Sequence, residues 1–259
     1  MCEDEKVDDI ADVDPIKRDS IINRSKVEWP NHTGKYPILY NCNIYHGCAH
    51  NCKYCYAALL TKHWTPNFQW ARAKYVSNAV ELAQKDIEQP PGRIMFCSMC
   101  DPYQPMEAKL RLAGKVLEVL LPSHHYILIL TKSDLVERDF GLIENYDNVE
   151  VGWTITSLRD LPEWEPNAPG NTRRIEALRQ AHDRSIRTFL SVEPWIPGVS
   201  DPIAIVEALK DVANRFIFGA LNYVRADKSV YKQDVPKLVA LCKSYGINYV
   251  LKKELKPYA

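Results

Sequence analysis

The sequence predicts an α/β fold in which helices cover a parallel β-sheet. Strand-length apolar runs alternate with helical periodicity, in six strand-helix steps followed by a final strand. These runs are continuous rather than alternating, which is typical of strands buried on both faces. Ligands of α/β layers and barrels bind at the carboxyl ends of the strands. The polar residues just after each run are therefore the candidates for a site.

Each element follows from its local pattern. Segments with the apolar content and length of strands cover residues 36–41, 93–97, 126–130, 149–156, 186–192, 215–218 and 247–251. Segments with helical periodicity cover residues 76–88, 106–121, 139–145, 171–184, 201–212 and 235–245. Pro90-Pro91-Gly92 ends the first helix and Gly246 ends the last, while Asn171 or Thr172 is expected to cap the fourth.

Composition places the chain among ordinary globular proteins. Of its 259 residues, 46% are hydrophobic and 25% are charged, which excludes collagen-like, disordered and disulfide-scaffold classes. No stretch approaches the roughly 20 apolar residues that span a bilayer. The first 30 residues are acidic where a secretory signal would be basic and then apolar. We therefore expect a cytoplasmic protein without membrane association.

A formal charge of zero conceals an uneven distribution. The first 14 residues contain seven acids and one lysine, which leaves 32 bases and 26 acids in the rest of the chain. We expect an acidic N-terminal arm and lead-in over residues 1–30 and one α/β domain over residues 31–259. The mildly basic domain is compatible with a nucleic-acid partner but does not demand one.

Three of the eight cysteines lie close together after the first strand. Cys48, Cys52 and Cys55 have the spacing C-x3-C-x2-C. A structural zinc ion takes four protein ligands, so zinc would need His50 or a distant cysteine. An iron-sulfur cube held by three thiolates keeps one iron open to an exchangeable ligand. The spacing therefore favours a reactive cluster over a structural ion.

The motif C-x3-C-x-aromatic-C, with Tyr54 as the aromatic residue, resembles that of the radical S-adenosylmethionine (SAM) superfamily. The sequence around the motif is similar to sequences of one branch of the superfamily. This branch contains proteins related to spore photoproduct lyase and radical SAM proteins that resemble DNA repair photolyases. The similar stretches are Ser20-Ile21-Ile22-Asn23, Asn43 through Ala57, Asp101 through Glu107, Thr131-Lys132-Ser133, Arg138-Asp139 and Glu165-Pro166. The resemblance thus covers roughly residues 20 to 200.

This resemblance implies a partial (β/α)6-type TIM-like barrel with the cluster loop after its first strand, here with an extra C-terminal strand. It implies a 4Fe-4S cluster on Cys48, Cys52 and Cys55, and reductive cleavage of SAM to a 5'-deoxyadenosyl radical. An electron donor such as flavodoxin or ferredoxin is then expected. The substrate could be a nucleic-acid lesion or a nucleotide. The alternatives are a small-molecule or peptide substrate, or a non-catalytic iron-sulfur or zinc protein.

The resemblance also suggests cofactor-binding residues. Tyr54 would cover the adenine, Ser98 and Asp101 would bind the methionyl amine, and Lys132 would pair with the carboxylate. The other candidates follow later strands: Ser133, Thr156, Ser157 and Glu193. Asp101 could instead cap a following helix, Tyr54 could be a buried loop aromatic, and the remaining polar residues could simply face solvent.

Cys97 and Cys100 form a second close pair, at the end of the second strand. Lesion-repair members of the branch carry a hydrogen-donating cysteine near this place, so either thiol could have that role. A pair of buried, inert cysteines is the alternative. The chain departs from the repair pattern because its C-terminus forms another strand-helix-strand unit instead of a duplex-gripping extension. The basic and aromatic residues between Lys62 and Arg72 could stack a base or only pack.

Overall fold

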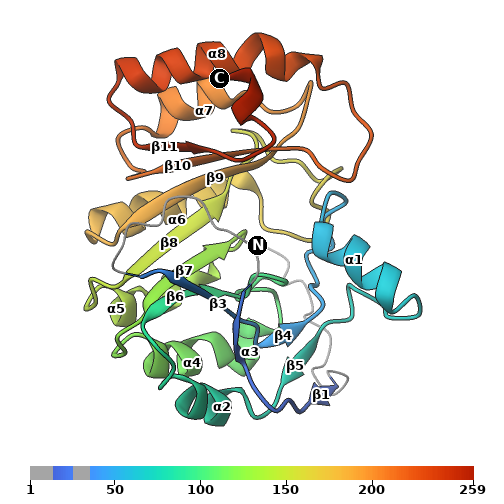
Figure 1. The fold of residues 1–259 in the computed structure, drawn as a ribbon, viewed down its shortest axis with the longest axis vertical. Helices are drawn as coiled ribbons and strands as arrows, with labels where there is room; N and C mark the ends of the chain where they lie inside the picture. The colour runs from blue at the N-terminus through green and yellow to red at the C-terminus, as the bar shows by residue number, and fades with distance from the viewer. Residues whose placement is uncertain (1–13, 26–35) are drawn as a thin grey trace, which may run out of the picture.

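The computed structural model describes residues 14–25 and 36–259. Within these ranges the main sheet has the strand order β11-β10-β9-β8-β7-β6-β3-β2 (Figure 1). The parallel strands are β3 (Ile38–Cys42), β6 (Gly92–Phe96), β7 (Tyr126–Thr131), β8 (Val149–Thr154), β9 (Thr188–Trp195), β10 (Phe216–Ala220) and β11 (Tyr249–Leu251). The sheet is open because β11 and β2 are its two edges. The predicted α/β fold with a partial barrel of parallel strands is confirmed.

Helices follow the strands as the sequence predicts, with differences at their ends. They are α2 (Ala79–Asp86), α3 (Glu107–Leu110), α4 (Leu112–Leu120), α5 (Phe140–Ile143), α6 (Asn171–Asp183), α7 (Pro202–Leu209) and α8 (Ser229–Ser244). A 3-10 helix, η2 (Asp134–Asp139), precedes α5, and another, η3 (Lys256–Tyr258), follows β11. Figure 1 shows α7 and α8 beside β10 and β11, and α2 and α4 at the other end of the sheet.

The single helix predicted over residues 106–121 is interrupted. Arg111 has a left-handed backbone with φ of 50°, which separates α3 from α4. The buried carboxylate of Glu107 accepts the Leu112 and Ala113 N–H groups, each at 3.0 Å. These are N–H groups that the first turn of a helix leaves free. A buried side chain therefore restarts the helix, and the apolar periodicity cannot reveal it.

Two other helix predictions were wrong at their N-terminal ends. Helix α8 begins at Ser229 rather than at residue 235, because Tyr231 anchors an earlier turn. Its hydroxyl donates to Trp195 O at 2.7 Å and accepts the Leu221 N–H at 2.9 Å. Neither Asn171 nor Thr172 caps α6: the N-cap position is Gly170, and Asp160 Oδ1 accepts the Thr172 N–H at 3.2 Å.

The elements around the cysteine loop were not predicted from the sequence, and all of them except β1 lie between β3 and β6. The strands β1 (Pro15–Ile16), β5 (Lys74–Val76) and β4 (Tyr45–His46) form a small second sheet, and α1 (Tyr56–Trp64) follows the cluster cysteines. Figure 1 shows this sheet and α1 on the same side of the main sheet. Strands of two or three residues are too short to show an alternating pattern. Together these elements carry the cysteine loop.

The lead-in before the first parallel strand packs on the domain. Strand β2 (Ile22–Arg24) pairs antiparallel with β3. Asp86 Oδ2 accepts hydrogen bonds from Ser20 Oγ at 2.7 Å, Ile21 N at 2.6 Å and Ile22 N at 3.1 Å. Most of the acidic arm, and the boundary expected at residues 30 and 31, lie outside the described residues. In the described ranges, no helix combines the length and apolar character needed to cross a bilayer.

Candidate active site

The cysteine loop lies between β4 and α1 and is fixed by its backbone. Cys48 N donates to Trp70 O at 3.0 Å, and Cys55 N donates to Cys52 O at 3.1 Å. Gly47 has φ of 91°, and a Cβ there would lie 2.6 Å from Trp70 O, so only glycine fits this close approach. The fully buried Gln104 accepts the Ala49 N–H at 2.9 Å and donates to Gly47 O at 3.4 Å. The loop is therefore rigidly held.

The three loop cysteines are free thiols whose burial differs. Cys48 and Cys52 are buried, while Cys55 is half-buried at the start of α1. Burial raises the pKa of Cys48 well above its ordinary value and that of Cys52 to about 11. Within the described part of the chain, no group of three His, Cys, Asp or Glu side chains is arranged around a single metal ion. Three thiols on one loop would fit an iron-sulfur cluster, in which each sulfur would bind its own iron.

Tyr54 is locked in place by a buried ion pair that the sequence did not reveal. Its hydroxyl donates to Glu165 Oε1, and Arg174 Nη2 donates to Glu165 Oε2 at 2.6 Å. The side chains of Arg174 and Glu165 are 1% and 3% exposed. Lys53 N also donates to Trp164 O at 2.9 Å. The loop after β8 thus clamps the cysteine loop, with its glutamate held by α6.

Asp101 joins three segments through one carboxylate. Its Oδ1 accepts hydrogen bonds from Thr131 Oγ1 at 2.7 Å and Tyr103 N at 2.9 Å, and its Oδ2 accepts Lys132 N at 2.7 Å. His50 Nδ1 lies 3.3 Å from Oδ2. Burial alone would raise the pKa of Asp101, but His50 and these hydrogen bonds lower it to about 2. Asp101 caps no helix, since α3 begins six residues later at Glu107.

The predicted residues after β7 lie near this carboxylate. Lys132 Nζ lies 5.5 Å from the centre of the Tyr54 ring, a cation-π geometry that joins two predicted cofactor residues. Ser133 caps η2, because its side chain accepts the Leu135 N–H at 3.1 Å. The structure therefore shows a local capping role for Ser133, and its role toward a cofactor stays a prediction.

Ser98, Thr156 and Ser157 differ in how their hydroxyl groups are used. Ser98 Oγ accepts a hydrogen bond from Asn43 Nδ2 at 3.4 Å, and Ser157 Oγ accepts the Arg159 N–H at 3.1 Å. Thr156 is fully buried, and its Oγ1 has no hydrogen-bond partner among the described residues. A buried hydroxyl without a partner is costly unless a ligand satisfies it. Thr156 is thus the predicted residue that most clearly offers a free polar group.

Glu193 lies within β9, which continues to Trp195, and not after the strand as the sequence predicts. Lys252, directly after β11, places its Nζ 2.7 Å from Glu193 Oε1 and 2.6 Å from Oε2. Gly219 of β10 makes room for this carboxylate, since a Cβ there would lie 2.7 Å from the Glu193 side chain. The extra C-terminal strand therefore supplies the partner of a predicted site residue.

Cys97 and Cys100 occupy the turn after β6. Cys100 Sγ donates a hydrogen bond to Tyr45 O at 3.6 Å, and burial raises the pKa of both thiols. Cys97 is 3% exposed, whereas Cys100 is half-buried. The backbone of Cys97 is left-handed, with φ of 59°.

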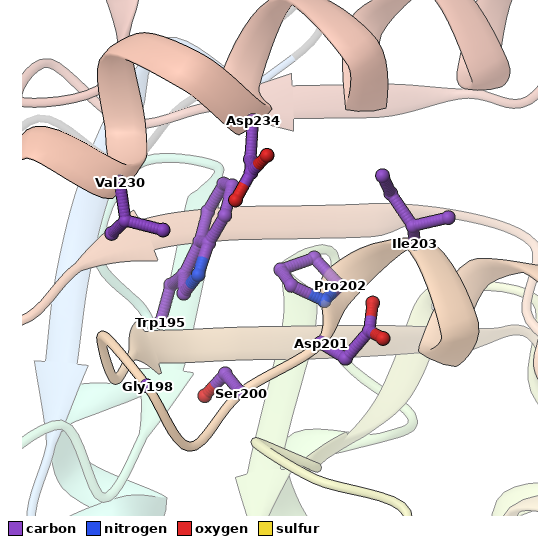
Figure 2. Close-up of a pocket in the computed structure, with 8 residues that line it drawn as sticks. All are labelled: Trp195, Gly198, Ser200, Asp201, Pro202, Ile203, Val230 and Asp234. Atoms are coloured by element: carbon purple, nitrogen blue, oxygen red, sulfur yellow. The ribbon is translucent and has the colours of Figure 1, made fainter.

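Two cavities lie at this end of the fold. One, of about 460 Å³, is lined by Trp164, Ile196, Leu221 and Arg225, among others. Ile196 and Leu221 share an apolar cluster with Cys52 and Tyr54, so this cavity borders the cysteine loop. Figure 2 shows the other, of about 350 Å³, beside the starts of α7 and α8. None of the predicted site residues lines it.

Comparisons of the sequence with known proteins identify the family of the chain. The sequence profile of the radical SAM superfamily matches residues 42–212. An uncharacterized protein of Methanocaldococcus jannaschii is 31% identical over 223 residues, which are 83% of this chain and 84% of the relative. An uncharacterized protein of Acidianus two-tailed virus is 27% identical over 208 residues, covering 71% of this chain and 67% of the relative.

Solved structures share the fold at low sequence identity. Spore photoproduct lyase complexed with dinucleoside spore photoproduct has a TM-score of 0.61 at 13% identity, over 82% of this chain and 75% of that protein. Streptococcus suis SuiB bound to S-adenosylmethionine has a TM-score of 0.56 at 11% identity, over 86% of this chain and 52% of that protein. The sequence profile covers more than half of the chain and includes all three loop cysteines. The chain belongs to the radical SAM superfamily.

Proposed function

We propose that this chain is a radical SAM enzyme that holds a 4Fe-4S cluster through Cys48, Cys52 and Cys55. The observation that carries the proposal is the loop itself: three free thiols, fixed by Trp70, Gln104 and the Glu165 pair, lie at the carboxyl ends of parallel strands. When bound, the cluster and SAM supply one-electron cleavage of the sulfonium to a 5'-deoxyadenosyl radical. The protein's part is to bind and orient these groups and to shield the site from water and oxygen.

The residues around the loop support a binding site for SAM. The Tyr54 ring, fixed by Glu165, offers a flat face to an adenine, and Thr156 Oγ1 offers an unused hydrogen-bonding group. Lys132 provides the positive charge for a carboxylate. Ser98, Ser133, Ser157 and Glu193 complete the proposed set, although each already has a protein partner. The half-buried Cys55 is the most accessible cluster ligand, where an electron donor such as flavodoxin or ferredoxin would approach.

For the substrate we propose a nucleic-acid lesion or a nucleotide. The support is threefold: the similarity in fold to spore photoproduct lyase with its dinucleoside ligand, the cavity beside the loop, which Trp164 and Arg225 line, and the thiols at the end of β6. Cys97 or Cys100 would give a hydrogen atom to the substrate radical. Replacing both by alanine should leave SAM cleavage intact but change the product formed from a thymine-dimer-type DNA. An unaltered product would remove the thiol role, and no binding of any nucleic acid by the wild type would remove this substrate class.

Metal analysis tests the cluster directly. Reconstituted protein should contain about four irons and matching sulfide per chain, and alanine at Cys48, Cys52 or Cys55 should abolish the iron-sulfur absorbance. Cys242→Ala is the matched control, because Cys242 is a buried thiol on α8 and should be dispensable. Stoichiometric zinc without sulfide, or full cluster content in any loop variant, would overturn the assignment.

A further inference from the structure

The exposed apolar side chains lie mainly around the cysteine loop. Among the described residues, the large hydrophobic side chains that reach solvent are Tyr56, Leu59, Leu60, Trp64, Leu158, Tyr223 and Tyr245. All except Tyr245 are on α1, which begins directly after Cys55, or in the loops that follow β8 and β10. Apolar groups that gather in one region, rather than scatter singly, are typical of an interaction surface. The elements that border the candidate site thus present a contact surface to solvent.

The loop between β10 and α8 holds an exposed tyrosine in an unusual backbone conformation. Its start is fixed because Leu221 N donates to the Tyr231 hydroxyl at 2.9 Å. Its end is fixed because Ser229 N donates to Asp227 Oδ1 at 2.9 Å. Between these anchors, Tyr223 has a left-handed backbone with φ of 63°, and its side chain is 69% exposed. Residues with a side chain seldom adopt this conformation, and such strain concentrates at functional sites.

This loop packs against the cysteine loop. Val224 and Ala226 contact the apolar cluster that contains Cys52 and Tyr54. Arg225, between them in the chain, lines the cavity of about 460 Å³ that borders the cysteine loop. That volume is in the range of sites for small ligands. Figure 1 shows the connection between β10 and α8 on the side of the sheet where α1 lies. A ligand in this cavity would therefore lie beside the proposed cluster.

The charges of this surface suit an anionic partner. Residues 29–80, which include the cysteine loop and α1, contain no Asp or Glu, and their basic residues are Lys35, Lys53, Lys62, Arg72 and Lys74. In the loop between β10 and α8, Arg225 and Lys228 are exposed, and neither forms an ion pair with the described part of the chain. The carboxylate of Asp227 is engaged by the Ser229 N–H. Cations beside exposed aromatic rings are the combination that holds single-stranded nucleic acids.

We propose that the loop between β10 and α8 binds an unpaired stretch of nucleic acid, with Tyr223 stacked on a base and Arg225 on a phosphate. Every base has a face that an aromatic ring can cover, but that face is accessible only outside the stacked duplex. A guanidinium matches the oxygens of a phosphate. The proposal rests on the proposed function for its substrate class and assigns the residues that hold the strand. The leucines of α1 alone would suit a protein partner, whereas the tyrosine and the unpaired cations favour a strand.

Binding of short oligonucleotides to the reconstituted protein tests this assignment. Fluorescein-labelled DNA and RNA strands of about 12 nucleotides, and the corresponding duplexes, are titrated anaerobically with the protein in the presence of SAM. Fluorescence anisotropy reports the affinity. We expect a single strand to bind more tightly than its duplex, and the DNA and RNA titrations show which sugar the site accepts.

Variants of the two residues separate stacking from charge. Tyr223→Ala should weaken binding of the single strand at least about fivefold, while Tyr223→Phe keeps the ring and should bind as the wild type does. Arg225→Gln should reduce the slope of the logarithm of affinity against the logarithm of salt concentration by about 0.7, the value for one phosphate contact on a single strand. Tyr245→Ala and Lys243→Gln, an exposed aromatic residue and an exposed cation at the other end of α8, are the matched controls and should change neither quantity.

Three results would overturn the proposal. Wild-type affinity and salt slope in both Tyr223→Ala and Arg225→Gln would mean that the strand is held elsewhere. Tighter binding of the duplex would exclude an unpaired stretch as the ligand. Absence of any strand binding, with electron transfer from flavodoxin slowed by Tyr223→Ala, would assign the loop to a protein partner instead. Thermal unfolding of each variant separates a lost contact from a lost fold.

The cofactor assignment is measured on the same samples through iron, sulfide and 5'-deoxyadenosine. Strand binding that depends on the loop, without 5'-deoxyadenosine, contradicts the proposed function alone. Formation of 5'-deoxyadenosine, with strand binding that is insensitive to Tyr223 and Arg225, contradicts this proposal alone. If the wild type forms 5'-deoxyadenosine but binds no strand, both this proposal and the nucleic-acid substrate class are wrong, and SAM cleavage is unaffected.

Discussion

Asp101 holds the strand ends of the site together with a single carboxylate. Three hydrogen bonds from Thr131, Tyr103 and Lys132 reach it, and His50 lies beside it. The resemblance to radical SAM enzymes predicts that this carboxylate binds the methionyl amine of SAM. The contacts show that it has a structural role as well, so the two roles must be separated by experiment.

The variant Asp101→Ala should lower both stability and cofactor affinity. Leaving several buried donors without an acceptor costs about 1–3 kcal/mol each, and a lost charge-assisted hydrogen bond to SAM costs about 1.5–3 kcal/mol. Urea unfolding measures the first effect, and equilibrium binding of SAM to the iron-loaded variant measures the second. A destabilised fold with unchanged SAM affinity would mean that Asp101 is structural only.

Glu165 should matter more to stability than Tyr54, the residue it positions. Glu165→Ala leaves the guanidinium of Arg174 buried without its carboxylate, which typically costs about 3–5 kcal/mol. Tyr54→Phe removes only a hydroxyl donor and should cost about 1.5–3 kcal/mol. Urea unfolding of both variants compares them. If both variants lost the same small amount of unfolding free energy, the buried ion pair of Glu165 and Arg174 would not stabilise the loop as described.

At the scale of the elements, α6 and α8 end in the same way with different residues. Ser185 (φ 60°) and Gly246 (φ 65°) both have left-handed backbones. Ile186 N donates to Ala181 O at 3.0 Å, and Ile247 N donates to Cys242 O at 2.9 Å. Both are Schellman ends, where glycine is the favoured residue. Serine at position 185 therefore carries a backbone cost that Gly246 avoids.

Exchanging these two residues tests that cost. Ser185→Gly should stabilise the protein by up to about 1 kcal/mol, and Gly246→Ser should destabilise it by a similar amount. A Cβ at Gly246 would meet nothing within 4 Å, so the loss there would come from the backbone alone. Thermal unfolding of both variants provides the measurement. If both variants changed the melting temperature in the same direction, the left-handed backbone would not explain the difference between the two helix ends.

The Asp86 link between α2 and the lead-in should make stability depend on pH. Burial would raise the pKa of Asp86, but hydrogen bonds from Ser20, Ile21 and Ile22 lower it below the ordinary 3.8. The unfolded chain therefore takes up the proton first as the pH falls. The stabilisation is complete above the ordinary value and is lost as the pH falls through the lower folded-state pKa. Urea unfolding of wild type and Asp86→Asn should differ most near pH 7 and converge in acid, whereas parallel profiles would contradict the link.

The parallel strands were predictable, but the supports of the site were not. Most of these strands, such as β6, β8 and β10, are largely apolar runs buried on both faces, so local sequence is sufficient to find them. Gln104, Glu107 and Arg174 are polar residues in loops or helices, and their burial depends on segments far away in the chain. Burying a polar group costs free energy unless a partner compensates it, and this cost would have pointed to these three residues. Their burial, however, is known only once the fold is known. The Arg111 break depends on Glu107 for the same reason.

For the whole molecule, the family match ends before the last part of the sheet. The profile covers residues 42–212, while β10, α8 and β11 follow it. These elements extend the sheet and supply Lys252 to Glu193. The C-terminal unit therefore continues the barrel and adds a charged contact at the strand ends.

The central claim is that this chain binds a cluster and cleaves SAM. Anaerobic incubation of the reconstituted protein with a reductant and SAM, followed by chromatography for 5'-deoxyadenosine, tests it most directly. We predict 5'-deoxyadenosine from the wild type and from Cys242→Ala, and none from Cys48→Ala, Cys52→Ala or Cys55→Ala. A wild-type protein with a complete cluster that forms no 5'-deoxyadenosine, or a loop variant that still forms it, would contradict the account.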